Sequence, residues 1–375
     1  MENAITFTET DRRFMQRALE LAALGLTTTH PNPRVGCVLA HGDEIVGEGW
    51  HRAAGEAHAE TLALAAAGER SRGATAYVTL EPCAHVGRTP PCADALIAAG
   101  IARVVFASSD PDSRVDGAGL ARLRAAGIAV HGGLSAAAAD ELNAGFLSRM
   151  RRGRPFVRLK IATSLDGRTA LADGASQWIS SAAARADVQQ WRARSDAILT
   201  GIGTALADDP ALTVRVGDEP RRQPLRVVLD SRLRLPSSAK LLTSPGKALI
   251  FSRRDAVGAE FAEAAQAAMR RDGIGLEWLE ADDTGLDLAG ALRHLATALQ
   301  INEVLVEAGA TLTGALLRAA LVDELLIYQA PMLLGPEARA LAKIPQLAQL
   351  KEALHFQYTE LAVVGGDLRM RLRPA

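Results

Sequence analysis

Cysteine, long apolar runs and an excess of charge of one sign are all scarce in this sequence of 375 residues. Three cysteines cannot form a disulfide framework, so we expect a reducing, cytoplasmic environment. No uninterrupted apolar stretch reaches the roughly 18 residues of a membrane span. The polar, acidic start "MENAITFTETDRRF" also lacks the features of a signal peptide. With 42 basic and 43 acidic residues, the chain has no charge footprint of a general nucleic-acid binder.

Short apolar runs alternate with helical stretches along the chain, and the length predicts two domains. In residues 1–150, "VGCVLA", "AYVTL", "ARVVFAS" and "GIAVHGG" are predicted strands between helices, the last helix running from residue 135 to about 150. This pattern predicts an α/β domain with helices on both faces of a sheet. The arginine-rich "RMRRGRP" at 149–155 is interpreted as a solvated linker. Residues 151–375 form a second α/β series that ends in a predicted hairpin.

Two of the three cysteines lie close to a histidine and a glutamate in the sequence. His58 and Glu60 fall near the start of a predicted helix, Cys83 follows a predicted strand, and Cys92 opens the next helix. Imidazole and thiolate are ligands that Zn²⁺ prefers, and three of them leave a fourth position for a water of lowered pKa. Glu60 would carry protons without being a ligand, as in zinc-dependent base deaminases. The pattern predicts a catalytic metal site, whereas Cys37, inside "VGCVLA", is predicted to be a core residue.

The second half contains two weaker signals. In "EVLVEAGATLTGALL" a strand enters a Gly/Thr-rich turn and a helix, where backbone N–H groups suit a pyrophosphate. An ordinary strand–turn–helix junction without a ligand is consistent with the same sequence. Lys160 is one of five lysines and the only one before position 240, and it lies in the predicted strand "VRLKIA". A charge is costly to bury there, so the ammonium indicates a point charge beside a substrate oxygen, with a lysine snorkelling from an edge strand as the alternative.

Longer motifs indicate a family. "HAE…EPCAHVGRTPPC", with "HPNPRVGCVLA" upstream, resembles the cytidine deaminase superfamily, but with eight residues between the cysteines instead of two. Together with a reductase-like second half, it resembles the bacterial bifunctional enzymes of riboflavin biosynthesis. In these, a diaminohydroxyphosphoribosylaminopyrimidine deaminase is fused to a 5-amino-6-(5-phosphoribosylamino)uracil reductase. The resemblance implies a cytidine-deaminase-like αβα layered domain over residues 1–150 and a dihydrofolate-reductase-like α/β domain over residues 151–375.

The resemblance also implies roles for residues of the first half. One zinc ion per chain would be held by His58, Cys83 and Cys92. Glu60 would be the proton donor and acceptor when 2,5-diamino-6-(5-phosphoribosylamino)pyrimidin-4(3H)-one is deaminated. Contacts to the pyrimidine and the ribose phosphate fall on Asn32, His51, Arg88 and Asp110. The chain reads "DPDS" where the family usually shows "DPNP", so Asp112 and Ser113 depart from the family pattern.

"KIATSLDGRTA", "SQWISS", "GIGTALADDPALTVR" and "VEAGATLTG" resemble the reductase domain of the same family. The resemblance implies reduction of the ribosyl group to a ribityl chain by NADPH, with Lys160 as a catalytic residue. Substrate contacts fall on Ser176, Arg192, Leu212, Arg215 and Glu307, of which the two guanidinium groups suit a phosphate. NADPH contacts fall on Ala162, Trp178, Thr204, Asp208, Ser231, Gly309, Ala310, Thr311, Leu312, Thr313, Gly314 and Ala315.

Two other functions share parts of this pattern. An RNA-editing deaminase with an RNA-binding appendage would show a short Cys-x-x-Cys pair and a basic surface, which the chain lacks. A zinc-stabilised binding protein without catalysis would have no need of Glu60. The resemblance implies small phosphorylated pyrimidines as substrates, no nucleic acid or membrane as partner, and a homodimer formed through the reductase domain.

Overall fold

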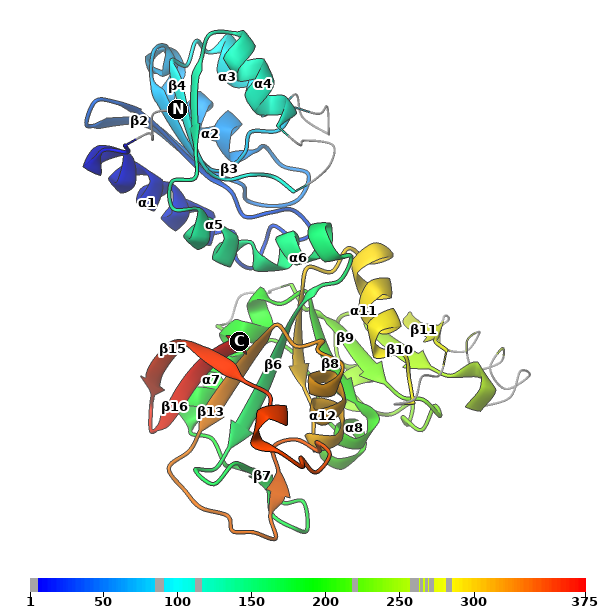
Figure 1. Ribbon diagram of the computed structural model, residues 1–375. Coiled ribbons are helices and arrows are strands. Elements are labelled where there is room, and N and C mark those ends of the chain that lie inside the picture. Colours follow the sequence, from blue (N-terminus) through cyan, green and yellow to red (C-terminus); the bar gives the residue numbers. More distant parts are fainter. Residues whose placement is uncertain are drawn as a thin grey trace. The chain divides into compact units, whose positions relative to one another are not determined.

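The computed structural model describes residues 6–84, 91–111, 117–217, 222–256, 263, 266, 269, 273–280 and 285–375. The chain divides into two compact units, one ending at Gly153 and the other running from Arg154 to Ala375. Each unit has its own sheet and helices (Figure 1). Among the described residues, none of the helices combines the length and the apolar character that a membrane span requires.

A five-stranded sheet in the order β2-β1-β3-β4-β5 forms the centre of the first unit. β1 is antiparallel to β2 and β3, while β3, β4 and β5 are parallel to one another. The elements in chain order are α1 (Glu9–Ala23), β1 (Gly36–His41), β2 (Glu44–Trp50), α2 (Ala59–Ala67), β3 (Thr75–Leu80), α3 (Cys92–Ala98), β4 (Arg103–Ser108), α4 (Ala118–Ala125), β5 (Ala129–Gly132), α5 (Ala136–Leu142) and α6 (Ala144–Arg152).

Alternate residues of β1 face two different layers of helices. Cys37 and Leu39 pack with α2, α3 and α4, whereas Val38 and Ala40 pack with α1 and α5. Because successive side chains of a strand point to opposite faces, the sheet is covered on both sides, as Figure 1 shows. The expected αβα layering and the core position of Cys37, which is fully buried, are confirmed.

The end of the first unit differs from the sequence-based expectation. The single helix predicted over residues 135–150 is two helices, because Asn143 between α5 and α6 leaves the helical conformation at φ −108° and ψ 18°. The boundary between the two units falls within the arginine-rich stretch, as predicted, but the first part of the stretch is helical, since α6 continues to Arg152 and Arg149 donates to Pro31 O at 3.2 Å. β2 is a strand that the sequence pattern missed, because two glycines interrupt its apolar residues.

The second unit contains a nine-stranded sheet in the order β11-β10-β9-β8-β12-β6-β13-β16-β15. The strands from β11 to β13 are parallel, and β16 and β15 are added antiparallel. The elements are β6 (Phe156–Thr163), β7 (Arg168–Ala170), α7 (Ala182–Arg194), β8 (Ala197–Gly201), α8 (Ile202–Asp208), β9 (Leu225–Leu229), α9 (Lys240–Thr243), β10 (Ala248–Ser252), β11 (Ile274–Trp278), α11 (Leu288–Thr297), β12 (Glu303–Glu307), α12 (Ala310–Arg318), β13 (Glu324–Gln329), β14 (Arg339–Ala340), β15 (Phe356–Val364) and β16 (Asp367–Pro374).

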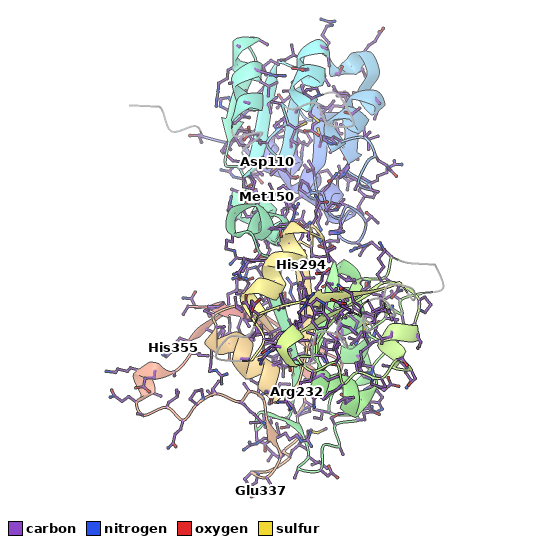
Figure 2. The ribbon with its side chains drawn as sticks, turned by 90° about the vertical axis from the view of Figure 1, so that its right-hand side faces the viewer. Asp110, Met150, Arg232, His294, Glu337 and His355 are labelled. Carbon is purple, nitrogen blue, oxygen red and sulfur yellow. The ribbon has the colours of Figure 1, made fainter. Side chains whose placement is uncertain are left out.

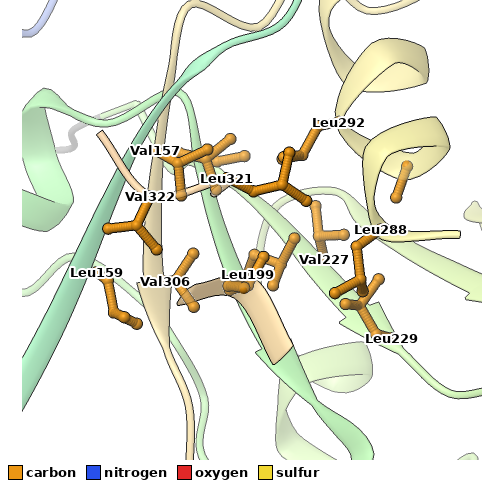
Figure 3. Packing of buried hydrophobic residues seen from close by; sticks show 14 of the residues in the cluster. Val157, Leu159, Leu199, Val227, Leu229, Leu288, Leu292, Val306, Leu321 and Val322 are labelled. Carbon is orange, nitrogen blue, oxygen red and sulfur yellow. The ribbon is translucent and has the colours of Figure 1, made fainter. Parts of the chain in front are cut away.

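Helices cover both faces of this sheet as well. On one face Leu288 and Leu292 of α11 pack over Val157, Leu199 and Val227 of neighbouring strands (Figure 3), and α12 joins the same core. On the other face α7, α8 and α9 pack against the sheet. The predicted C-terminal hairpin is confirmed as β15 and β16.

Candidate functional site

The three predicted zinc ligands come together at the ends of three elements. His58 is the N-terminal cap of α2, Cys83 follows β3, and Cys92 is the first residue of α3. His58 Nδ1 lies 3.1 Å from Cys92 Sγ and 3.7 Å from Cys83 Sγ, and the three ligand atoms lie within 4.8 Å of one another. One imidazole nitrogen and two sulfurs in such a group fit a Zn²⁺ site with one position left open.

Hydrogen bonds inside this group shift its pKa values. The hydrogen bond from the Cys92 thiol lowers the pKa of Cys83 to about 4, and the Cys92 backbone N–H also donates to Cys83 Sγ at 3.4 Å. The same thiol–thiol bond raises the pKa of Cys92, and the bond to Cys83 raises the pKa of His58. The geometry thus stabilises a thiolate at Cys83. Since metal ligands must be deprotonated, binding of a divalent cation would release the proton held by Cys92.

Glu60 lies on the first turn of α2, two residues after His58, and is only 3% exposed. Burial raises the pKa of its carboxyl, and the negative charge of Cys83 raises it further. A buried carboxyl whose pKa is raised can both accept and donate a proton during a reaction. The position beside the three ligand atoms therefore suits proton transfer.

Asn32 and His51, two of the predicted substrate contacts, lie together beside His58. Asn32 Nδ2 lies 3.0 Å from His51 Nε2, and His51 Nδ1 lies 3.1 Å from Ala57 O. These partners are consistent with a neutral ring that donates from Nδ1 and accepts at Nε2, and burial lowers the pKa of His51 accordingly. The His51 and His58 rings meet edge to face with centroids 5.5 Å apart. The structure thus brings the predicted contacts to the predicted metal ligands.

Asp110 is half-buried and follows β4, at the same edge of the sheet as Cys83, because β3 and β4 are parallel neighbours. It is labelled in Figure 2. Arg88 lies outside the described residues, so its predicted substrate contact stays a prediction. Asp112 and Ser113, which depart from the family pattern, also lie outside them.

Gly119, which the sequence analysis missed, supports the loop that carries Cys83. A Cβ atom at Gly119, in the first turn of α4, would lie 2.0 Å from Pro82 O. Helix α4 therefore lies so close to the loop that only glycine fits at position 119 without a shift of the backbone. A lone glycine in the helical stretch "AGLARLRA" is the signal that could have indicated this contact.

Predicted residues of the second unit gather at one edge of its sheet. β9, β8, β12 and β6 are neighbouring parallel strands, so their carboxyl ends meet there. Ala162 lies near the end of β6, Glu307 ends β12, and Thr204 and Asp208 lie in α8, directly after β8. Ser231 follows β9, next to Arg232, which is labelled in Figure 2. Ligands of open α/β sheets bind at this edge.

The turn from Gly309 to Ala315 forms the start of α12 at this edge. Gly309 is the helix cap, and its N–H donates to Thr204 Oγ1 at 3.0 Å, which ties the turn to α8. The first N–H groups of a helix have no partner within it and suit a pyrophosphate. Thr313 Oγ1 is buried without a hydrogen-bond partner among the described residues. The N–H groups at this helix start suit an anionic group such as a phosphate.

Lys160 lies in the interior of the sheet. β6 is flanked by β12 and β13, so the alternative of a lysine on an edge strand is wrong. Lys160 is in register with Glu307, whose carboxylate accepts from Arg192 Nε at 2.6 Å and Nη2 at 3.0 Å. Burial lowers the pKa of Lys160, an effect that Glu307 opposes and Arg192 reinforces. Burial raises the pKa of Glu307, but the positive charges of Arg192 and Lys160 outweigh this effect and lower the pKa. Glu307 is therefore a carboxylate that interacts with two cations.

The loop after α8 carries two further predicted substrate residues. Leu212 is buried with a φ of +48°. Arg192 Nη1 donates to Thr213 O at 3.1 Å, which joins this loop to the Lys160 group. Arg215 is exposed, and its backbone N–H donates to Gln189 Oε1 of α7 at 2.9 Å.

Ser176 and Trp178 lie in the segment between β7 and α7. Trp178 is 65% exposed, and the Arg185 guanidinium carbon lies 4.4 Å from its ring centroid. An exposed indole held by an arginine offers a flat apolar face, which suits contact with a cofactor ring.

Families of known proteins match both units. Residues 8–108 match the cytidine and deoxycytidylate deaminase zinc-binding region, and residues 155–369 match the RibD C-terminal domain. The riboflavin biosynthesis protein RibD of Escherichia coli is 50% identical over 373 residues, which are 96% of this chain and 99% of that protein. The RibD protein of Haemophilus influenzae is 47% identical and covers 99% of both chains.

Solved structures agree. Acinetobacter baumannii RibD, form 1, has a TM-score of 0.88 and 45% identity over 98% of this chain and 99% of that one. A diaminohydroxyphosphoribosylaminopyrimidine deaminase/5-amino-6-(5-phosphoribosylamino)uracil reductase from Thermotoga maritima has a TM-score of 0.85 and 31% identity, with 98% and 99% covered. These matches decide against an RNA-editing deaminase and against a binding protein without catalysis. The chain therefore belongs to the RibD family of riboflavin biosynthesis enzymes, which join a zinc-binding deaminase domain to a reductase domain.

Proposed function

We propose that this chain catalyses two successive reactions. The first unit hydrolyses the exocyclic amine of 2,5-diamino-6-(5-phosphoribosylamino)pyrimidin-4(3H)-one and releases ammonia. The second unit reduces the ribosyl group of 5-amino-6-(5-phosphoribosylamino)uracil to a ribityl chain with NADPH. The observation that carries the proposal is the tight group of His58, Cys83 and Cys92 beside the buried Glu60, in a chain of this family.

In the first unit we assign one Zn²⁺ per chain to His58, Cys83 and Cys92. Zn²⁺ held by these residues would supply the Lewis acidity that lowers the pKa of a water. Glu60 accepts and donates the protons of the hydrolysis, a role that its raised pKa and buried position support. The residues assigned to the pyrimidine and the ribose phosphate are Asn32, His51, Arg88 and Asp110.

In the second unit Lys160 presents its ammonium to the reacting end of the substrate. Arg192 uses both arms of its guanidinium fork on Glu307, so we assign it the role of orienting this carboxylate rather than of binding phosphate. Arg215, which is exposed, is the guanidinium that we assign to the substrate phosphate. Ser176 and Leu212 complete the substrate contacts.

NADPH is the reductant when bound, and the carboxyl edge of the sheet supports its placement. We assign its phosphates to the turn 309–315 and further contacts to Ala162, Trp178, Thr204, Asp208 and Ser231. A cytoplasmic location and a homodimer formed through the second unit complete the proposal.

An assay that follows ammonia and NADPH separately tests both reactions. With the diaminopyrimidine substrate and no NADPH, the protein should release one ammonia per substrate. With NADPH also present, NADPH should be consumed only after that release. Cys83→Ser should lose zinc and ammonia release together, yet still oxidise NADPH when given the deaminated substrate. Ammonia release at the wild-type rate by a zinc-free Cys83→Ser protein would overturn the deaminase assignment. Failure of the wild-type protein to oxidise NADPH with the deaminated substrate would overturn the reductase assignment.

A further inference from the structure

Asn143 interrupts the helical end of the first unit and turns its side chain toward the loop that carries Asn32. It lies between α5 and α6 and is 2% exposed. Its Oδ1 accepts from Arg34 N at 2.8 Å, and its Nδ2 donates to Arg34 O at 2.9 Å. A carboxamide offers a donor and an acceptor side by side, which matches the N–H and C=O groups of Arg34. The side chain therefore pairs with the Arg34 backbone as a neighbouring strand would.

The same stretch of backbone is held from its other side by His51. His51 N donates to Val35 O at 2.9 Å, and the His51 ring lies 3.0 Å from the amide nitrogen of Asn32. The Arg34–Val35 backbone is thus fixed between Asn143 on one side and His51 on the other. Asn32 lies two residues from the Asn143 contact, in the same short stretch of backbone.

Two further bonds join the loop to the helical end of the unit. Arg34 Nη1 donates to Leu142 O at 2.7 Å, and Arg149 of α6 donates to Pro31 O at 3.2 Å. Met150, labelled in Figure 2, marks the position of α6. The loop from Pro31 to Arg34 is therefore braced by residues 142–149, more than 100 positions later in the sequence.

We propose that Asn143 is a positioning residue of the deaminase site, which holds Asn32 and His51 in the arrangement that binds the phosphoribosylaminopyrimidine. This inference rests on the proposed function, in which Asn32 and His51 contact the substrate. The proposed zinc ligands and Glu60 lie on α2, α3 and the loop after β3, and among the described residues Asn143 makes no hydrogen bond to these segments. Loss of the amide pair should therefore weaken substrate binding and leave the metal and proton transfer in place.

Asn143→Asp in the full-length protein provides the test. The change keeps the shape and one acceptor but replaces the N–H donor by a carboxylate oxygen facing Arg34 O. We expect KM for the deamination to rise at least tenfold, with kcat within threefold and with zinc content and NADPH oxidation unchanged. Asn143→Leu, which removes both bonds, should raise KM further. Asn302→Asp, the same change at a buried asparagine of the second unit, should leave KM for the deamination unchanged.

Hydrogen exchange of the peptide spanning residues 30–36 gives a readout independent of activity, and it should become faster in Asn143→Asp and Asn143→Leu. Unchanged KM and unchanged exchange in both variants would overturn the proposal. Loss of zinc, or a fall in kcat at constant KM, would also overturn it, because Asn143 would then act on the metal or the fold. If wild-type protein fails to deaminate the substrate, the proposed function fails, whereas the exchange experiment still decides whether Asn143 holds the loop.

Discussion

Glu60 lies in the first turn of α2 and His58 is the cap of that helix, so the proposed proton carrier and a proposed metal ligand are held by the same rigid element. Glu60→Gln keeps the volume but removes the ability to gain and lose a proton. We expect deamination to fall by about 10²-fold or more, the typical effect of losing a general acid or base, while zinc content stays at the wild-type level. Ammonia release and metal analysis on the same preparation measure both.

The exposed Glu69, just after α2, provides the control. Glu69→Gln removes the same charge from the same region and should leave deamination unchanged. Near-normal turnover of Glu60→Gln would show that protons reach the leaving amine by another route.

Lys160 carries its charge in the interior of the second sheet. Its strand, β6, is flanked by β12 and β13, and Glu307 of β12 is in register with it. Arginine keeps the charge but spreads it over a larger planar group, which would have to fit beside Arg192. We therefore expect Lys160→Arg to lose about as much NADPH oxidation as Lys160→Ala, about 10²-fold or more for removal of a placed electrostatic group. Steady-state rates with the deaminated substrate measure this loss.

Lys240→Arg is the matched control, since this lysine side chain is 64% exposed and pairs with Asp209. It should reduce substrate at the wild-type rate. If Lys160→Arg does the same, the ammonium at position 160 has no role as a point charge.

At the scale of elements, a close contact between a helix and a loop supports the proposed metal ligands. The loop that carries Pro82 and Cys83 packs against α4, where Gly119 leaves no room for a side chain beside Pro82 O. Gly119→Ala should displace the Pro82–Cys83 backbone and destabilise the unit by about 1–3 kcal/mol, as expected for overpacking. We also expect zinc to be lost to a chelator faster than from wild-type protein.

Gly203→Ala in the first turn of α8 is the corresponding control, because no described atom beyond its chain neighbours and its own helix backbone lies within 4 Å of a Cβ added there. Zinc retention should be unchanged in this variant. Wild-type zinc retention and stability in Gly119→Ala would show that the loop adapts without cost and that the contact with α4 does not support the metal ligands.

At the scale of the whole molecule, each unit has its own hydrophobic core and its own group of candidate site residues. Fragments divided between Gly153 and Arg154 should therefore fold separately, because this division leaves α6 and its contact to Pro31 intact. We expect the fragment 1–153 to bind zinc and deaminate, and the fragment 154–375 to oxidise NADPH with the deaminated substrate. A cooperative melt must first show that each fragment is folded.

A folded N-terminal fragment that binds zinc but does not deaminate would contradict the independence of the two sites. In that case residues from the second unit or from another subunit must complete the deaminase site. An equimolar mixture of the two fragments would distinguish these cases, since it should restore deamination only if the second unit is required.

Much of this molecule follows from local sequence. The spacing of apolar residues predicted most strands and the helices on both sheet faces, because strand and helix periods depend on neighbouring residues. The group His58, Cys83 and Cys92 could be predicted as well, since few residue types bind Zn²⁺. Each of the three also lies at a strand end or a helix start that the sequence pattern indicates. Glu60 could be included because it lies two positions from His58 in the same helix.

Only the tertiary structure decided features that join distant segments. The place of β6 between β12 and β13, and hence the interior position of Lys160, depends on strand order, which local patterns do not encode. The pairing of Arg192 with Glu307 joins residues 115 positions apart. The break of the final helix at Asn143 depends on the Arg34 backbone, 109 positions earlier. Residue chemistry is local and can be read from the sequence, whereas the partner of a buried polar group is chosen by packing of the whole unit.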